Sequence, residues 1–337
     1  MGPLIAISAG DPVGVGPEIC ARALADFDGP GSAVLFGNRD SLGKAARLAA
    51  VDSSSLQALE SAAVPAPGRI GLVHCGPDCP APQAVGVESA RIQLASLEKA
   101  SQAVLAGRCD LLVTAPVSKA SISSILPGFR GHTEYLARIC EMNTDEVTMV
   151  FVSEELSVGL ISTHHPMREV PDTITAERCE RTALHLSEIV SALKPGRLPR
   201  LALAALNPHA GENGLLGDEE RTVLAPCAER LARESGLDIS GPLPADSAFR
   251  AAANGRFDAV IAAYHDQAMI PLKLAGIGRS VNVTAGLPFV RTSPDHGVAY
   301  DVAGSGRAES AGMKLAIEIA VRIWLARFSA GDRNDRS

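Results

Sequence analysis

The chain is poor in aromatic side chains, in positive charge and in long apolar runs. Phe, Trp and Tyr make up 4% of its 337 residues, so few rings are present on which single-stranded nucleic acid could stack. The formal net charge is −7 without a long basic cluster, which argues against a nucleic-acid partner. No apolar run approaches the roughly 20 residues of a membrane span. We therefore expect neither nucleic acid nor a membrane as a partner.

Neither a disulfide framework nor a zinc finger is indicated by the cysteines. Seven are scattered along the chain, most of them in apolar helical patterns where a reduced, buried thiol is the ordinary state. The segment "HCGPDC" (74–79) has half of a zinc-site spacing, but no second cysteine pair follows it. The first residues lack a basic start followed by an apolar segment of signal length, and we expect a cytoplasmic protein.

Short apolar runs alternate with longer segments of helical periodicity. Helical period is clear in 87–107, 176–194 and 311–328, where apolar side chains recur on one face. Near-continuously apolar strands between such helices indicate a mostly parallel sheet covered on both faces. We therefore predict an α/β fold. The expected strands are 3–9, 32–37, 109–115, 147–153, 157–163, 200–206, 258–264 and 279–285.

Chemically competent polar residues follow several of these strands. His164 stands in "STHHP", His209 in "NPHAG" and His265 in "AYHDQ". The carboxyl ends of parallel strands meet at one edge of a sheet, where ligands bind. Three imidazoles at such an edge suit a divalent transition metal with open positions for substrate. Each could instead be a hydrogen-bonded loop residue, and either member of the pair His164 and His165 could point inward.

Anion-binding side chains and one glycine-rich loop are further candidates. His132 and Thr133 precede a helical pattern in "GHTEYL", where Thr133 could cap the helix or the two could donate to a phosphate. Arg291 and Lys273 follow apolar stretches, and arginine suits bidentate phosphate recognition. The loop "GDPVGVGPE" (10–18) has glycines at a helix start but not the dinucleotide fingerprint, so a tight turn and a ligand loop both remain open.

Taken in order, the motifs resemble those of the 4-hydroxythreonine-4-phosphate dehydrogenase family of pyridoxal phosphate biosynthesis. The match runs from about residue 4 to residue 320, and "HGVAYDVAGSGRA" is also similar to the cofactor loop of isocitrate and isopropylmalate dehydrogenases. The motifs that carry the resemblance are "GDPVGVGPEI", "TAPVSK", "GHTEYL", "THHPMREVP", "LNPHAGENGLLGDEE", "GPLPADSAF", "YHDQAMIPLK" and "NVTAGLPFVRTSPDHGVAYDVAG".

The resemblance implies a two-lobed α/β/α fold of the isocitrate/isopropylmalate dehydrogenase type, not a Rossmann fold. It implies an outer, cofactor-side lobe of residues 1–128 plus 286–337 and an inner lobe, 129–285, with the metal ligands and the dimer contacts. It also implies a homodimer whose active site lies at the subunit interface. The implied reaction is the oxidation of a phosphorylated 3-hydroxy acid by NAD, or alternatively NADP, followed by decarboxylation, with one divalent metal ion (Zn, Mg or Co) in each site.

The same resemblance assigns roles to individual residues. The implied metal ligands, drawn from both subunits, are His164, His209 and His265, and the family pattern selects His164 over His165. The implied substrate-binding residues are His132, Thr133, Lys273, Asn282 and Arg291. The cofactor residues expected on the loop are Asp295, His296, Gly297, Tyr300 and Asp301. Candidates for catalytic roles are Lys273, Asp266 and Asp246.

Several positions depart from the family pattern. Ala268 and Met269 stand where Gly and Leu are usual, Ala285 where Leu is usual, and Val298 and Tyr300 where Thr and Phe are usual. We expect several of these positions to line the pocket. They keep open a sister branch that acts on four-carbon sugar-acid phosphates such as erythronate or threonate 4-phosphate. A phosphometabolite-binding protein without catalysis would lack a histidine or an anion anchor, and none is missing.

Overall fold

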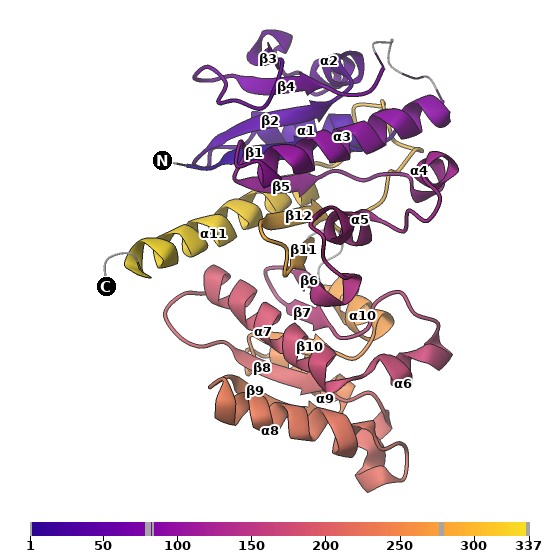
Figure 1. Ribbon diagram of the computed structural model, residues 1–337, viewed down its shortest axis with the longest axis vertical. Helices are drawn as coiled ribbons and strands as arrows, with labels where there is room; N and C mark the ends of the chain where they lie inside the picture. The colour runs from indigo at the N-terminus through magenta and orange to yellow at the C-terminus, as the bar shows by residue number, and fades with distance from the viewer. Residues whose placement is uncertain (1, 78–81, 83, 276–279, 335–337) are drawn as a thin grey trace. The chain divides into compact units, whose positions relative to one another are not determined.

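The computed structural model describes residues 2–77, 82, 84–275 and 280–334 and divides into two compact units (Figure 1). The first unit is Met1–Met142 with Leu287–Ser337, and the second is Asn143–Gly286. The family resemblance implies that the chain passes from the first lobe to the second at 128/129. In the structure the first unit continues to Met142 and includes the helix that begins at His132. None of the helices within the described ranges is long and apolar enough to cross a membrane.

The first unit contains six parallel strands in the order β3-β4-β2-β1-β5-β12. Helix α3 packs against β1, β2 and β5, while α11 packs against β5 and β12. The strands are β1 (Leu4–Ser8), β2 (Ser32–Gly37), β3 (Leu56–Leu59), β4 (Ile70–His74), β5 (Leu111–Thr114) and β12 (Val290–Pro294). The helices are α1 (Gly16–Ala25), α2 (Arg39–Leu48), α3 (Val87–Leu105), α4 (Lys119–Ile125), α5 (His132–Ile139) and α11 (Ala311–Asn334).

The second unit has the strand order β11-β6-β7-β10-β8-β9. Strand β6 pairs antiparallel with β11 and β7, whereas β7, β10, β8 and β9 are parallel. Its strands are β6 (Thr148–Val152), β7 (Ser157–Leu160), β8 (Arg200–Ala204), β9 (Asp238–Leu243), β10 (Ala259–Ala262) and β11 (Val281–Ala285). Its helices are α6 (Val170–Thr173), α7 (Ala176–Leu193), α8 (Ala225–Glu234), α9 (Ala245–Ala253) and α10 (His265–Ala275).

Helices cover both faces of the second unit's sheet. Val158 and Leu160 point into a core that includes side chains of α9 and α10. Between them Gly159 faces α7, where a β-carbon would come within 3.0 Å of Thr182. This coverage explains why the strands are apolar on both sides, as the sequence predicts.

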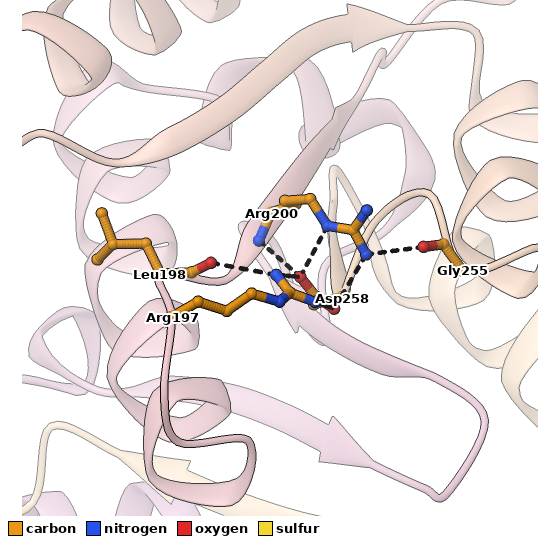
Figure 2. Close-up of polar contacts among 5 residues, drawn as sticks. All are labelled: Arg197, Leu198, Arg200, Gly255 and Asp258. Atoms are coloured by element: carbon orange, nitrogen blue, oxygen red, sulfur yellow. Dashed lines mark hydrogen bonds and ion pairs between the residues drawn. The ribbon is translucent and has the colours of Figure 1, made fainter.

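A buried carboxylate ties the amino ends of β8 and β10 together (Figure 2). Asp258, just before β10, accepts two hydrogen bonds of 2.7 Å from the guanidinium of Arg197. It also accepts the backbone N–H of Arg200 at 2.8 Å. The hydrogen bond from Arg197, opposed by burial, holds the pKa of Asp258 well below its usual range, and the bonds from Arg200 lower it further. The contact sets the register of the two strands at this end.

Replacing Asp258 by Asn should destabilise the fold in a pH-dependent way. The lost charge-assisted hydrogen bonds should lower the free energy of unfolding at pH 7 by about 2 kcal/mol. Because the folded pKa is depressed, the wild-type contribution is complete above the unfolded pKa of about 3.9 and is lost as the pH falls through the folded pKa. Urea unfolding from pH 7 downwards should therefore show the two proteins converging below about pH 4.

The matched control is Glu234→Gln, which removes an exposed ion pair with Arg233 and should cost less than about 1 kcal/mol. A difference between wild type and Asp258→Asn that stays constant down to the lowest pH would contradict this assignment.

Candidate active site

The three histidines lie beyond the carboxyl ends of three neighbouring parallel strands. Strand β10 lies between β7 and β8. His265 follows β10, His164 follows β7 and His209 follows β8. The sequence predicts that polar residues gather at such an edge, and the topology of the second unit places all three loops there.

Two of these imidazoles lie side by side. The ring centres of His164 and His265 are 5.4 Å apart, and two imidazoles on one Zn²⁺-like ion, with bonds of about 2 Å, have centres about 5 Å apart. The Nδ1 of His265 lies 2.7 Å from the carboxylate of Asp266, which leaves Nε2 for a ligand. His165 instead contacts Ser162 through Nδ1 at 3.1 Å. The pair therefore fits a divalent metal, and of the two neighbouring histidines it is His164 that faces His265.

His209 does not complete this group within one chain. It is exposed, on a turn with left-handed backbone (φ 52°, ψ 30°). Across the part of the chain that the structure describes, no three His, Cys, Asp or Glu side chains are grouped closely enough to hold a metal ion. A three-histidine site thus stays a prediction. Cys79 of the "HCGPDC" segment lies outside the described residues, and Cys75 is buried.

Gln267 links the carboxyl ends of β10 and β8, the strands that precede His265 and His209. Its Oε1 accepts the N–H of Ala263 at 2.7 Å, just past β10, and its Nε2 donates to the carbonyl of Ala205 at 2.8 Å, just past β8. Gln267 therefore fixes the point from which α10 starts with His265. The sequence shows Gln267 in "YHDQ", but only the structure reveals this role.

The first unit contains a buried cation suited to an anion. Arg291 on β12 is 2% exposed, and its Nη2 donates to Thr114 Oγ1, at the end of β5, at 2.6 Å. Burial lowers the pKa of Arg291 to about 10, against the opposite effect of Glu134, so the guanidinium is still charged at neutral pH.

His132 lies next to this charge at the start of α5. Its Nε2 is buried and has no hydrogen-bond partner among the described residues. Burial lowers the pKa of His132 well below its usual value, and the charges of Arg291 and Lys119 lower it further. The imidazole is therefore neutral near pH 7 and can donate one hydrogen bond to an anion. Thr133 follows it, partly exposed. Lys119, in "TAPVSK", adds a second cation that the sequence reasoning did not select.

The remaining predicted substrate and catalytic residues belong to the second unit. Lys273 is exposed on α10, two turns after His265, and Asp246 is exposed in the first turn of α9. Asn282 on β11 has a buried Oδ1 without a hydrogen-bond partner within the described ranges. The chain thus places Asp266 against His265, but it shows no contact that fixes a proton-transfer role for Lys273 or Asp246.

The predicted cofactor loop follows β12 and is mostly exposed. Asp295 is half-buried, whereas His296, Gly297, Tyr300 and Asp301 are exposed. The Tyr300 hydroxyl donates to Asp11 at 2.6 Å, where burial raises the pKa of the carboxyl. This hydrogen bond depends on one of the departures from the family pattern, since a phenylalanine has no hydroxyl.

The glycine-rich loop "GDPVGVGPE" supports the cofactor loop. The N–H of Val15 donates to the carbonyl of Val298 at 2.9 Å, and a β-carbon at Gly14 would come within 2.9 Å of the same oxygen. Buried Glu18 accepts the N–H of Ala308 at 3.2 Å. The N–H of Val15, the residue just before α1, is thus committed to a protein contact, which favours the tight-turn interpretation over a pyrophosphate loop.

Three of the departures are buried in the second unit. Ala268 and Met269 are 0% and 6% exposed and pack among the buried residues of the second unit, and Ala285 is 2% exposed. Their apolar side chains face inward because α10 and β11 turn these positions toward the packed layers. The expectation that several of the five departures line the pocket stays a prediction.

Known proteins resemble the chain over nearly its full length. The family model for the pyridoxal phosphate biosynthetic protein PdxA matches residues 31–320. A 4-hydroxythreonine-4-phosphate dehydrogenase of Azoarcus sp. (strain BH72) is 41% identical over 96% of this chain and 97% of its own. A D-threonate 4-phosphate dehydrogenase of Pectobacterium atrosepticum is 37% identical over 96% of this chain and 100% of its own.

The fold is also that of a solved structure. The crystal structure of 4-hydroxythreonine-4-phosphate dehydrogenase from Klebsiella pneumoniae superposes with a TM-score of 0.80 at 35% identity, covering 96% of this chain and 98% of the other. The predicted fold class and the family resemblance drawn from the motifs are both confirmed. This chain belongs to the PdxA family of pyridoxal phosphate biosynthetic proteins.

Proposed function

We propose that the chain oxidises and decarboxylates 4-phosphohydroxy-L-threonine to 3-amino-2-oxopropyl phosphate in pyridoxine and pyridoxal phosphate biosynthesis. The observation that supports the proposal is the charged, buried Arg291 beside the neutral His132, because a cation and a hydrogen-bond donor together suit a phosphate. The substrate loses hydride from C3 to NAD, or NADP, and the resulting 3-keto acid loses carbon dioxide. The 41% identity to a relative of that name supports the assignment.

In this proposal the first unit binds the phosphate. Arg291 supplies the fixed charge, His132 and Thr133 donate hydrogen bonds, and Lys119 adds positive charge nearby. The cofactor would lie along the exposed loop after β12, which the glycine-rich loop holds through Val15 and Tyr300 holds through Asp11. Residues 14–17 are then structural and do not bind the pyrophosphate.

The second unit would hold one divalent metal ion (Zn, Mg or Co) through His164 and His265. The chemistry that such an ion supplies when bound is Lewis-acid polarisation of the substrate hydroxyl. Asp266 orients the ring of His265. Lys273 is the proposed proton carrier, with Asp246 as a second candidate, and Asn282 directs a buried oxygen that can accept a hydrogen bond from the substrate.

We propose further that His209 binds the metal ion that is held by His164 and His265 of a second copy of the chain. This accounts for the two imidazoles that lie together and the third that does not join them. The enzyme is then a homodimer with an active site at the subunit interface, and a cytoplasmic location belongs to the same proposal. A closed two-fold dimer would carry two identical sites of this kind.

A second candidate is the oxidation of D-threonate 4-phosphate, because a relative of that name matches 37% over its whole length. The two substrates differ at C2, amino in one and hydroxyl in the other. Purified enzyme should be assayed for NADH formation with each, before and after removal and restoration of divalent metal. We expect the higher kcat/KM with 4-phosphohydroxy-L-threonine, and its loss on metal removal. A preference for D-threonate 4-phosphate would overturn the assignment in favour of the second candidate.

Arg291→Met should weaken binding of the phosphorylated substrate. Removing the guanidinium that pairs with a buried phosphate costs about 2–4 kcal/mol of binding free energy. The Michaelis constant should therefore rise by about 30-fold or more. The variant should also lose competitive inhibition by inorganic phosphate. Arg108→Met, at an exposed position after α3, is the matched control. An unchanged Michaelis constant in the Arg291 variant would show that the phosphate binds elsewhere.

The neighbouring histidines give a sharp test of the metal ligands. His164→Ala should weaken Zn²⁺ or Co²⁺ binding by more than about 100-fold, since residues outside the ligand shell alone account for about 10- to 100-fold. His165→Ala should retain the metal, because that ring is directed to Ser162. Metal content after dialysis measures both. Equal losses in the two variants, or a loss in His165→Ala alone, would reject the assignment.

A further inference from the structure

The turn that carries His209 has an unfavourable backbone. From His209 to Asn213 every residue has positive φ, with values of 52°, 54°, 78°, 44° and 56°. Only one of the five is glycine, and L-residues avoid this region because Cβ crowds the following carbonyl. A run of this kind does not hold itself, so contacts outside the turn must fix it.

The buried carboxylate of Glu220 accepts hydrogen bonds from Asn207, the residue at the start of this turn. Glu220 is 5% exposed. Its Oε1 accepts the backbone N–H of Asn207 at 2.7 Å, and its Oε2 accepts the Asn207 side-chain Nδ2 at 2.9 Å. The same Nδ2 also donates to Glu219 at 2.6 Å. We call these contacts the Asn207–Glu220 clasp.

Two glycines allow the clasp to close. A β-carbon at Gly217 would come within 2.2 Å of Asn207 Nδ2, and one at Gly211 within 2.7 Å of Glu220 Oε2. The N–H of Leu216 donates to the carbonyl of Gly211 at 3.1 Å and closes the loop. Glu220 itself begins a π-helical turn, Glu220–Leu224, that leads into α8. The far end of the loop is thereby fixed to the body of the unit.

We propose that Glu220 is a positioning residue, which acts through Asn207 to hold His209 in the orientation that binds metal. The inference rests on the proposed metal-dependent function. A buried carboxylate is poor evidence for stability alone, since apolar replacements are often as stable. Here both carboxylate oxygens of Glu220 accept hydrogen bonds from Asn207. Asn207 lies two positions before His209, so this contact can orient the imidazole.

The test is a Co²⁺ titration of the metal-free, full-length enzyme followed by visible absorption, which reports how cobalt is coordinated. Glu220→Gln keeps the shape but replaces one accepting oxygen by a donor. Its affinity for Co²⁺ should fall about 10- to 100-fold, and its visible spectrum should change. The matched control is Glu229→Gln, an equal change of charge at an exposed position of α8, and should behave as wild type.

Gly211→Ala provides a second variant that leaves Glu220 in place but pushes on its Oε2, and it decides the question if Glu220→Gln fails to fold. If whichever of the two variants folds binds Co²⁺ with the affinity and spectrum of the wild type, the positioning role is wrong and the proposed function still stands. A wild-type enzyme that binds no Co²⁺ would instead reject the metal-dependent function, and the positioning role with it. A lowered melting temperature with unchanged cobalt binding would show that Glu220 is only structural.

Discussion

The arrangement of the three histidines depends on the parallel register of β7, β10 and β8. This register brings the loops of His164, His265 and His209 to one edge of the second unit's sheet. Between β10 and β8 the register is supported at both ends, by Asp258 and its arginines at the amino ends and by Gln267 at the carboxyl ends. Because these hydrogen bonds join particular residues of the two strands, they favour one alignment in addition to the one that the apolar pattern specifies.

The two units contribute different chemistry. The first has a buried guanidinium, a neutral imidazole and a loop anchored by the glycine-rich turn. The second has the neighbouring imidazoles of His164 and His265, and a third imidazole, that of His209, on a strained turn. Neither set is complete as a catalyst, since hydride transfer needs an acceptor and decarboxylation needs a place for the electrons that the departing carboxylate leaves. A phosphorylated hydroxy acid has groups that match both sets: an anion, a hydroxyl and a carboxylate.

Sequence patterns predicted eight strands from apolar runs, and all eight are present. They missed β12 and β9, because "VRTSP" contains Arg and Pro, and "DISGPL" contains Gly and Pro. They also missed β3 and β4, the two strands at one edge of the first unit's sheet, although "IGLVH" in β4 is mostly apolar. The histidines were visible because each follows a recognisable strand. Lys119, Gln267 and Glu220 were not, since their roles depend on the nearness of His132, Ala205 and Asn207, which only folding creates.

The most direct test of the shared metal site is to mix two inactive variants. His209→Ala and His265→Ala chains should each be inactive alone, because every site in such a dimer lacks a ligand. If His209 serves the other copy, a hybrid dimer has one site with all three histidines and one with two missing. Chains combined at random should then recover about a quarter of wild-type activity. No recovery from verified hybrid dimers would contradict the account, because it would mean that the three histidines do not act across two copies.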